Sequence, residues 1–229
     1  MNRVHDMGGR IGDGSVPEVD AQDMFHRDWE KRAMAMTLAT GALGKWNIDA
    51  SRHARELLEP EDYRKFSYYE KWVSALTDIL VQTGLLDEVD LKNVIASDTQ
   101  PVPLNEKALR PQNVLAAMGA HVPYTREVGP TALFAIGDYV RTASQNTNRF
   151  VKGGHSRLPE YAMDCVGRIV DLHGTHVLPD SNAHFKGENP EPLYGVEFTA
   201  ETLWGVTAEG VGDTIVLDLW QSYLEAEGE

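Results

Sequence analysis

The hydrophobic pattern of this 229-residue chain changes near Val122-Pro123, and that change constrains the fold more than any other feature. Before it, apolar residues recur every three or four positions, which is the period of an amphipathic helix. After it come short apolar runs separated by turn residues, and some of them alternate as half-buried strands do. The pattern predicts an α+β protein whose first half is helical and whose second half is a small β-barrel.

Five helices are expected in the first half. The best defined begins at the capping box Ser67-Tyr68-Tyr69-Glu70, where a hydroxyl and a carboxylate satisfy free backbone amides, and it ends at Gly84. Its apolar face consists of Trp72, Val73, Leu76, Ile79 and Leu80. The other helices are expected from an apolar stripe before Gly41 (Phe25, Trp29, Ala33 and Met36), from Asn47 or Asp49 to Pro60, over residues 87–96, and from Pro111 to Gly119.

Four strands are expected in the second half, over residues 139–141, 168–170, 194–198 and 214–217. The first residues are rich in glycine and hold little that could pack, so composition alone favours disorder over an arm laid on another chain. The predicted organisation is this N-terminal segment over residues 1–22, a helical domain over 23–122, a linker over 123–130 and a β domain over 131–229.

The charge and the single cysteine exclude several classes of function. A net charge of −14 without any run of lysine or arginine argues against nucleic acid and against a membrane surface as partners. No apolar run approaches the roughly 18 residues of a membrane span, and the first residues do not resemble a signal peptide, so a cytoplasmic location is expected. Cys165 excludes an intrachain disulfide and a cysteine-built metal site, and we expect a buried, inert thiol.

One histidine cluster has to be weighed as a metal site. His173 and His176 are followed by Asp180 and His184, but Pro179 and a turn interrupt the segment, so neither helix nor strand is expected to align the side chains. A polar surface loop is the favoured interpretation. The chain also lacks a glycine-rich phosphate loop and a serine nucleophile elbow, so the residues alone indicate no self-sufficient active site.

Two arginines have distinctive settings. Arg52 is on a predicted helix with Glu56 one turn later, and Arg157 follows two glycines in the segment 153–159. A guanidinium binds planar or forked oxyanions well because its donors are fixed in a plane. The residues by themselves favour a solvated charge or a local ion pair at each position.

Nine segments, in order and over nearly the whole chain, resemble the β subunit of nitrile hydratase. They are Val4-His5-Asp6-Met7-Gly8-Gly9, Asp28-Trp29-Glu30-Lys31, the helix of Arg52, Tyr68-Tyr69-Glu70-Lys71-Trp72, Gly154-His155-Ser156-Arg157, Leu178-Pro179-Asp180, Leu193-Tyr194-Gly195-Val196-Glu197-Phe198, Glu201-Thr202-Leu203-Trp204-Gly205 and Asp218-Leu219-Trp220-Gln221-Ser222-Tyr223-Leu224. The resemblance implies a helical domain followed by an SH3-like barrel, and an arm that wraps a partner α subunit.

The resemblance also implies a division of labour. The α subunit would hold Co(III) or Fe(III) with a cysteine-rich loop in which two cysteines are oxidised, and the assembly, αβ or (αβ)2, would hydrate nitriles to amides. Arg52 and Arg157 would bond the oxidised cysteines, with His155 and Glu56 in support, as second-shell groups do. The residues matching the walls of the nitrile pocket are Tyr68, Trp72, Ile48 and Ser51.

Each implied role has a plainer alternative. Tyr68 and Trp72 could be core residues of their helix, and His155 could stabilise a turn. The family often has a bulky residue where Ser51 stands, so a wider pocket is expected there. A tryptophan at position 72, rather than another tyrosine, favours the cobalt type of the enzyme over the iron type. The chain departs from the family at Ala162-Met163-Asp164-Cys165, which lacks an arginine and leaves the details of the Arg157 loop open.

Three other identities compete with this one. A thiocyanate-hydrolase-like subunit shares the scaffold, but its two halves are separate chains. An assembly factor of the metallochaperone type resembles only the helical half and is short, whereas this chain keeps the barrel motifs around Trp204 and Trp220. A plain protein-interaction module is the third alternative.

Overall fold

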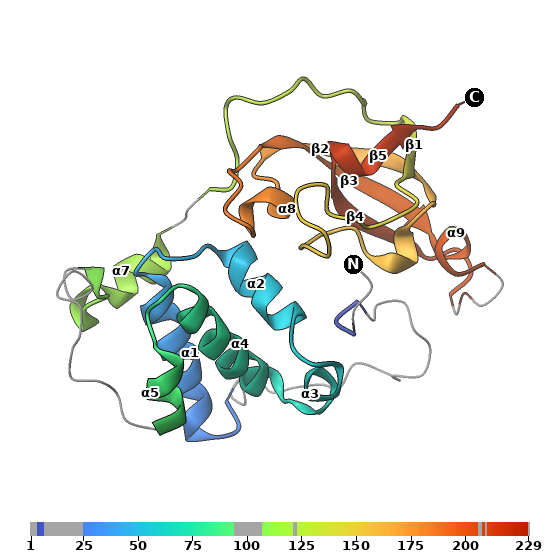
Figure 1. Cartoon of the computed structure of the whole chain (residues 1–229). Helices are drawn as coiled ribbons and strands as arrows, with labels where there is room; N and C mark the ends of the chain where they lie inside the picture. The colour runs from blue at the N-terminus through green and yellow to red at the C-terminus, as the bar shows by residue number, and fades with distance from the viewer. Residues whose placement is uncertain are drawn as a thin grey trace. The chain divides into compact units, whose positions relative to one another are not determined.

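The computed structural model describes residues 4–6, 25–93, 107–120, 123–205, 208 and 210–228 (Figure 1). The chain forms two compact units, Val16–Val122 and Met1–Ser15 with Pro123–Glu229. We call them the helical unit and the β unit and describe each by itself. The predicted arm over residues 1–22 lies outside the described residues except at positions 4–6, and residues 94–96 of one expected helix lie outside them as well.

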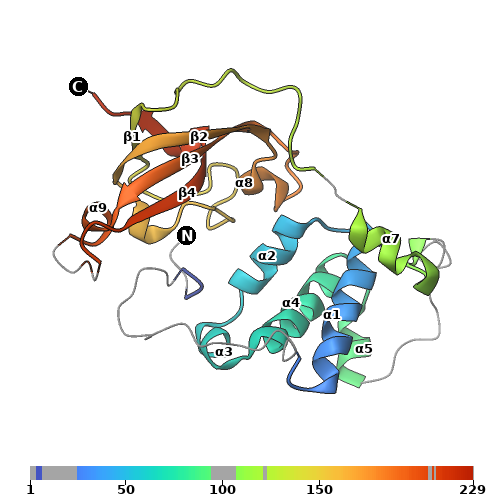
Figure 2. The same cartoon turned by 180° about the vertical axis from the view of Figure 1, so that it is seen from behind.

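The helical unit confirms the expected helices and adds one. Its elements are α1 (Asp28–Gly41), α2 (Ile48–Glu56), α3 (Pro60–Lys65), α4 (Tyr68–Gln82), α5 (Glu88–Asn93), the 3-10 turn η2 (Pro111–Asn113) and α7 (Val114–Gly119). Helix α4 packs against both α1 and α2 (Figure 2). The sequence placed an end at Pro60, but this proline begins α3, because the missing amide of proline costs nothing in the first turn of a helix.

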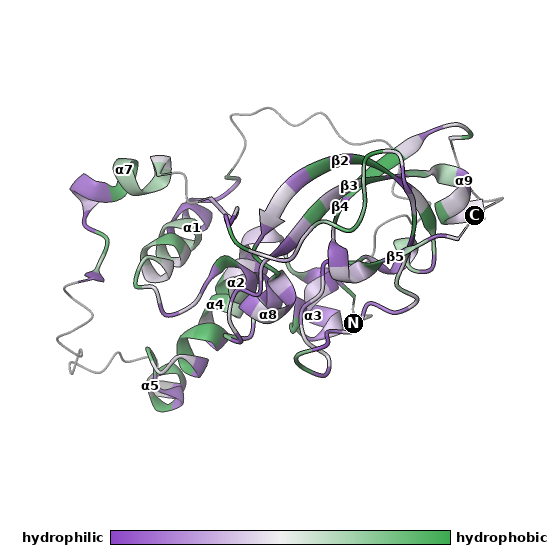
Figure 3. Ribbon diagram, turned by 90° about the horizontal axis from the view of Figure 1, so that it is seen from above, coloured by the Kyte–Doolittle hydropathy of each residue, from purple (hydrophilic) through white to green (hydrophobic). Residues whose placement is uncertain are grey.

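Small and large apolar residues interlock in the core of the helical unit. The buried cluster is Trp46, Ala50, Ala54, Ala75, Leu76 and Ile79. Alanines on α2 allow a close approach to α4, whose hydrophobic character is visible in Figure 3. Burying each of the larger side chains contributes about 1.5–3 kcal/mol. The predicted stripe on α1 is wrong at its end, since Met36 is 49% exposed while Ala33 is fully buried.

The β unit is built on one antiparallel sheet of five strands. They are β1 (Tyr139–Thr142), β2 (Val166–His176), β3 (Glu191–Thr199), β4 (Thr214–Trp220) and β5 (Leu224–Ala226). The hydrogen-bonded order is β4-β3-β2-β1-β5 (Figure 1). All four predicted strands are confirmed, and β5 was missed because its three residues are too few to show a period. The sheet is not shown closed into a barrel among the described residues.

Helical turns join the strands of the β unit. They are η3 (Glu160–Ala162), α8 (Pro179–Asn182), α9 (Ala200–Trp204) and η5 (Gln221–Tyr223). The core beneath them is made of Val140, Leu158, Ala162, Ile169, Tyr194, Val196, Phe198, Leu219, Tyr223 and Leu224. No helix in the described part of the chain is long and apolar enough to cross a membrane.

The histidine cluster does not form the surface loop that the sequence suggested. His173 and His176 belong to β2, and His173 Nε2 lies 3.0 Å from Asp218 Oδ1 of β4. Asp180 is in α8 and only 3% exposed, because α8 packs its first turn into the β unit. The prediction of a polar loop is therefore wrong, and the members of the cluster have separate roles.

Candidate functional site

One face of α2 carries three of the predicted site residues. Ile48, Ser51 and Arg52 lie three and four positions apart, so they share a face, and the same spacing adds Arg55 one turn later. The helix begins where the Asn47 side chain accepts a hydrogen bond from the Ala50 amide at 2.9 Å. The opposite face packs in the core of the helical unit. On this face Ile48 is 42% exposed, and Ser51, Arg52 and Arg55 are half-buried.

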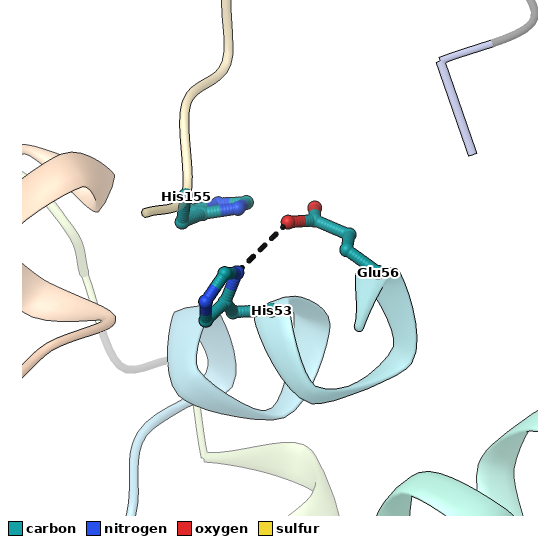
Figure 4. A group of neighbouring side chains, drawn as sticks. All are labelled: His53, Glu56 and His155. Atoms are coloured by element: carbon teal, nitrogen blue, oxygen red, sulfur yellow. Dashed lines mark hydrogen bonds and ion pairs between the residues drawn. The ribbon is translucent and has the colours of Figure 1, made fainter. Parts of the chain in front are cut away.

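Arg52 has an ion-pair partner that the sequence did not identify. Its Nη1 lies 3.1 Å from Oδ1 of Asp49, one turn earlier on α2, and Asp49 is buried. The sequence predicted Glu56 for this role, but the bond that the structure gives for Glu56 joins its Oε2 to His53 Nδ1 at 3.2 Å (Figure 4). Asp49 therefore fixes one edge of the guanidinium, while the Arg52 side chain remains 41% exposed.

Tyr68 and Trp72 lie one turn apart at the start of α4, as predicted. Their ring centroids are 5.5 Å apart, and the Arg55 guanidinium carbon is 5.0 Å from the centroid of the Trp72 ring. Tyr68 is 64% exposed, so it is not a core residue, whereas Trp72 is half-buried against its neighbours. Its neighbour Tyr69 is the tyrosine that packs in the core, with 8% of its surface exposed. Tyr68 is thus available to a ligand.

The capping box that opens α4 holds this aromatic pair in place. Glu70 Oε2 accepts a hydrogen bond from the Ser67 amide at 2.7 Å, as the sequence predicted. Hydrogen bonds from the backbone and side chain of Ser67 lower the pKa of Glu70, so the carboxylate stays charged at the positive end of the helix.

In the β unit, the segment that carries His155 and Arg157 is held by buried hydrogen bonds. Asn148 Nδ2 donates to the His155 carbonyl at 2.5 Å and to the Asp180 carbonyl at 2.8 Å. The His155 amide donates to His184 Nε2 at 2.9 Å. A Cβ at Gly154 would lie 2.5 Å from that same nitrogen, so only glycine allows this approach. His155 itself is buried.

The backbone of Arg157 is fixed from the far end of the chain. Its amide donates to the Tyr223 hydroxyl at 3.1 Å, and that hydroxyl in turn donates to Asp180 Oδ1. The Arg157 side chain is exposed, so the loop is anchored by its backbone and its guanidinium stays available. Sequence reasoning missed these roles of Tyr223, Asp180 and Asn148, because no local pattern marks them. Tyr223 bonds residues that lie 66 and 43 positions away in the chain.

Burial dominates the electrostatics of this anchor. It raises the pKa of Asp180 to about 6, against the opposing effects of the Tyr223 hydrogen bond and of the neighbouring His155 and Arg149, while Glu191 adds to the rise. Burial, followed by the charge of Asp180, raises the pKa of Tyr223 well above its ordinary value, so its hydroxyl remains protonated. A protonated phenol is what the donor role toward Asp180 requires.

Residues 162–165, where the chain departs from the family pattern, are bonded to β1. Thr142 Oγ1 donates to the Ala162 carbonyl at 2.5 Å and accepts from the Cys165 amide at 2.9 Å, which ties the segment to β1. Asp164 Oδ1 forms an ion pair with Arg141 Nη1 at 3.1 Å.

Asp6 belongs to the first of the segments that resemble the family. Its carboxylate accepts a hydrogen bond from the Glu160 amide at 2.9 Å, which anchors the start of the chain on the same unit.

Cys165 does not suit a role as a metal ligand. It is half-buried rather than fully buried as expected, and burial, followed by the charge of Asp164, raises the pKa of its thiol. A metal needs the thiolate, and the sequence offers no second cysteine. This chain therefore does not fit as the holder of a cysteine-ligated ion.

Comparisons with known proteins agree over nearly the whole chain. The family model of the nitrile hydratase β subunit N-terminal region matches residues 1–118, and the model of its C-terminal region matches residues 123–226. The low-molecular-weight cobalt-containing nitrile hydratase subunit β of Rhodococcus rhodochrous is 34% identical over 98% of this chain and 99% of its own. The nitrile hydratase subunit β of Pseudomonas putida is 34% identical with the same two coverages. The cobalt-containing subunit β of Pseudonocardia thermophila is 32% identical over 98% of this chain and 96% of its own.

Proposed function

Because this chain belongs to the nitrile hydratase β-subunit family, we propose that it supplies two arginines and part of the substrate pocket to a metal centre held by an α subunit. The reaction is the hydration of a nitrile to an amide. The observation that carries the proposal is the full-length family match combined with an exposed Arg52 whose guanidinium is fixed along one edge. The two arginines, Arg52 and Arg157, would bond the oxygens of oxidised cysteine ligands.

The setting of Arg52 suits an oxyanion. Asp49 occupies one of its nitrogens, and the side chain is 41% exposed, so other donors of the planar fork remain for a ligand. An ion pair on one edge limits rotation of the guanidinium, so less conformational entropy is lost when oxygens bind at the other edge. His53 and Glu56, bonded to each other on the same helix, add polar groups beside it.

The setting of Arg157 supports the same role by another route. Its backbone is fixed by Tyr223, and Asn148 and His184 bond the neighbouring His155 backbone. A rigid loop places an exposed guanidinium with little freedom, as groups that tune metal ligands require.

The metal would belong to the partner. This chain has one cysteine with a raised thiol pKa, so we assign Co(III) or Fe(III) to the α subunit, and two relatives named cobalt-containing favour cobalt. Such an ion supplies Lewis-acid chemistry that makes the nitrile carbon susceptible to attack by an oxygen nucleophile.

The substrate pocket would take one wall from α2 and α4. Tyr68 is exposed and can orient a nitrile through its hydroxyl, and Trp72 and Ile48 add apolar surface. Ser51 is short and leaves room between them. We also propose that the five-stranded sheet belongs to an SH3-like barrel and that the assembly is αβ or (αβ)2.

The competing identities are less well supported. Both family models match within one chain, whereas a thiocyanate-hydrolase-like subunit divides these halves between chains. An assembly factor that resembles only the helical half would not account for the match over residues 123–226.

Co-expression with a nitrile hydratase α subunit tests the proposal. The purified complex, loaded with cobalt, should convert a simple nitrile such as propionitrile to its amide, and each chain alone should not. Arg157→Lys should leave the complex intact on a sizing column but slow turnover strongly, whereas Arg64→Lys on the exposed surface of α3 should change nothing. An intact, metal-loaded complex without hydratase activity would defeat the proposal.

A further inference from the structure

Arg55 is the residue of the α2 face that the proposed function does not use. It lies four positions after Ser51 and three after Arg52, so it extends that face by one turn. Its guanidinium carbon is 5.0 Å from the centroid of the Trp72 ring, within the range of a cation–π contact. The tryptophan thus holds the guanidinium plane next to the aromatic pair of α4.

Arg55 has no protein acceptor among the described residues of its own unit. Across residues 25–93 and 107–120 of the helical unit, no hydrogen bond and no ion pair holds its guanidinium, although the residue is half-buried. The neighbouring Arg52 has Asp49, and Glu56 is bonded by His53. Burial, followed by the charge of Arg52, lowers the pKa of Arg55, although Tyr68, Glu56 and Tyr63 act in the opposite direction. An anionic ligand that paired with this half-buried cation would offset the free energy that the cation loses when water is removed from it.

The residues around Arg55 limit the size and shape of that ligand. Trp72 covers one side of the guanidinium, so the free donors lie along its edges. Ser51, one turn before it, leaves space because its side chain is short, and Ile48 continues the face with an apolar side chain. The arrangement therefore offers an apolar path that leads to a positive group.

We propose that Arg55 is a specificity-determining residue that selects nitriles carrying a carboxylate at the end remote from the nitrile group. The inference rests on the proposed function, because it assumes that the Tyr68–Trp72 pair lines the substrate pocket. The carboxylate would take two coplanar N–H donors of Arg55, and the aliphatic spacer would lie along Ser51 and Trp72. The product would be a carboxylate with a primary amide at its other end.

A matched pair of substrates tests this selection in the cobalt-loaded complex. One is 5-cyanopentanoate and the other is 5-cyanopentanamide, which has nearly the same shape without the charge. We expect the wild-type complex to prefer the carboxylate in kcat/KM. Arg55→Gln, which keeps a planar polar group without charge, should lower kcat/KM for the carboxylate by about 10- to 100-fold, mostly through KM, since a hydrogen bond to a charged group is lost. The value for the amide should stay within about threefold.

Three comparisons make the result decisive. Arg55→Lys should retain part of the preference, because it keeps the charge but not the two coplanar donors. Arg64→Gln removes an exposed arginine from α3 and should leave the preference as it is, which controls for a long-range charge effect. Melting temperatures of the variants within a few degrees of wild type would show that the loss is not one of folding.

Several outcomes would overturn the inference. Equal losses on both substrates with dissociation of Arg55→Gln from the α subunit would make Arg55 a contact for the partner protein. An unchanged preference in Arg55→Gln, or a wild-type complex without preference, would show that Arg55 does not bind the substrate. A complex that turns over propionitrile but neither longer substrate also refutes the inference, whereas one inactive on all three refutes the proposed function with it.

Discussion

The two regions that carry the candidate arginines are held in opposite ways. On α2, Arg52 is positioned by residues within one helical turn, with Asp49 three positions away and the Asn47 cap at the helix start. In the β unit, Arg157 is positioned by Tyr223, which is 66 residues away, and Tyr223 is bonded to Asp180 at a separation of 43. One arginine depends on local helix geometry and the other on the tertiary fold.

This difference indicates where each region is vulnerable. The side chain of Arg52 is exposed but paired, so its chemistry can be changed with little effect on packing. The Arg157 loop has its side chain in solvent and its backbone in a buried network, so the sensitive positions are its anchors. Variants of the two regions should therefore separate activity from stability.

The largest effect is expected from Arg52→Lys. An ammonium can keep the ion pair with Asp49 or reach an oxyanion, but it cannot offer coplanar donors to both. We expect kcat to fall about 100-fold, as when one preorganised donor to a reacting centre is removed, with the melting temperature and the assembly unchanged. Steady-state kinetics of the complex measure this. Near-normal turnover would mean that Arg52 is a surface ion pair and nothing more.

Gly154→Ala should act on stability in the β unit. A Cβ there would lie 2.5 Å from His184 Nε2 and 2.9 Å from the Val151 carbonyl, so the loop has to move. The expected loss is about 2 kcal/mol of unfolding free energy, with lower activity because Arg157 is displaced. Gly119→Ala is the control, since its Cβ would meet nothing within 4 Å. Denaturant titration of both variants measures the difference, and equal stabilities would contradict the close packing at Gly154.

The helical region was largely predictable from the sequence, for reasons visible in single residues. The capping box at Ser67 and Glu70 is a local pattern, and so is the i, i+4 pair Tyr68 and Trp72, so spacing alone placed them correctly. The sequence analysis chose the wrong ion-pair partner for Arg52. Asp49 and Glu56 are both one turn from Arg52, and only the packing that buries Asp49 decides between them.

The β region could be predicted only in outline. Strand periodicity located β1 to β4, but a turn-like run around Asp180 gave no sign that the carboxyl is buried under Tyr223. Long-range hydrogen bonds leave no spacing in the sequence to detect. Arg157 was marked by its glycine-led segment, but its role and that of His155 came from the family resemblance, and the network that holds them came from the structure.

Asp180 makes the stability of the β unit depend on pH. Burial raises the pKa of this carboxyl to about 6 in the folded protein, against about 4 in an unfolded chain. The folded state therefore favours the protonated acid. Asp180 therefore contributes its full share of the unfolding free energy below about pH 4. That share is lost as the pH rises through about 6, and above this pH there is no further change.

Asp180→Asn should remove that fall in stability. An amide oxygen can still accept from Tyr223, but it does not ionise, so the difference in unfolding free energy between variant and wild type should change by on the order of 2 kcal/mol between about pH 4 and about pH 6. Thermal unfolding across that range measures it. Parallel curves for the two proteins would show that Asp180 does not titrate in this window.

The smallest effects should come from a matched pair of helix caps, one in each region. Asn47 caps α2 by accepting from the Ala50 amide at 2.9 Å, and Thr199 caps α9 by accepting from the Thr202 amide at 3.2 Å. Each change to alanine should cost about 1 kcal/mol of unfolding free energy. Only Asn47→Ala loosens the turn that carries Asp49 and Arg52, so it alone should also lower kcat, by about two- to threefold. If Thr199→Ala slows the enzyme equally, the loss follows from general destabilisation, and local placement of Arg52 by α2 would have to be abandoned.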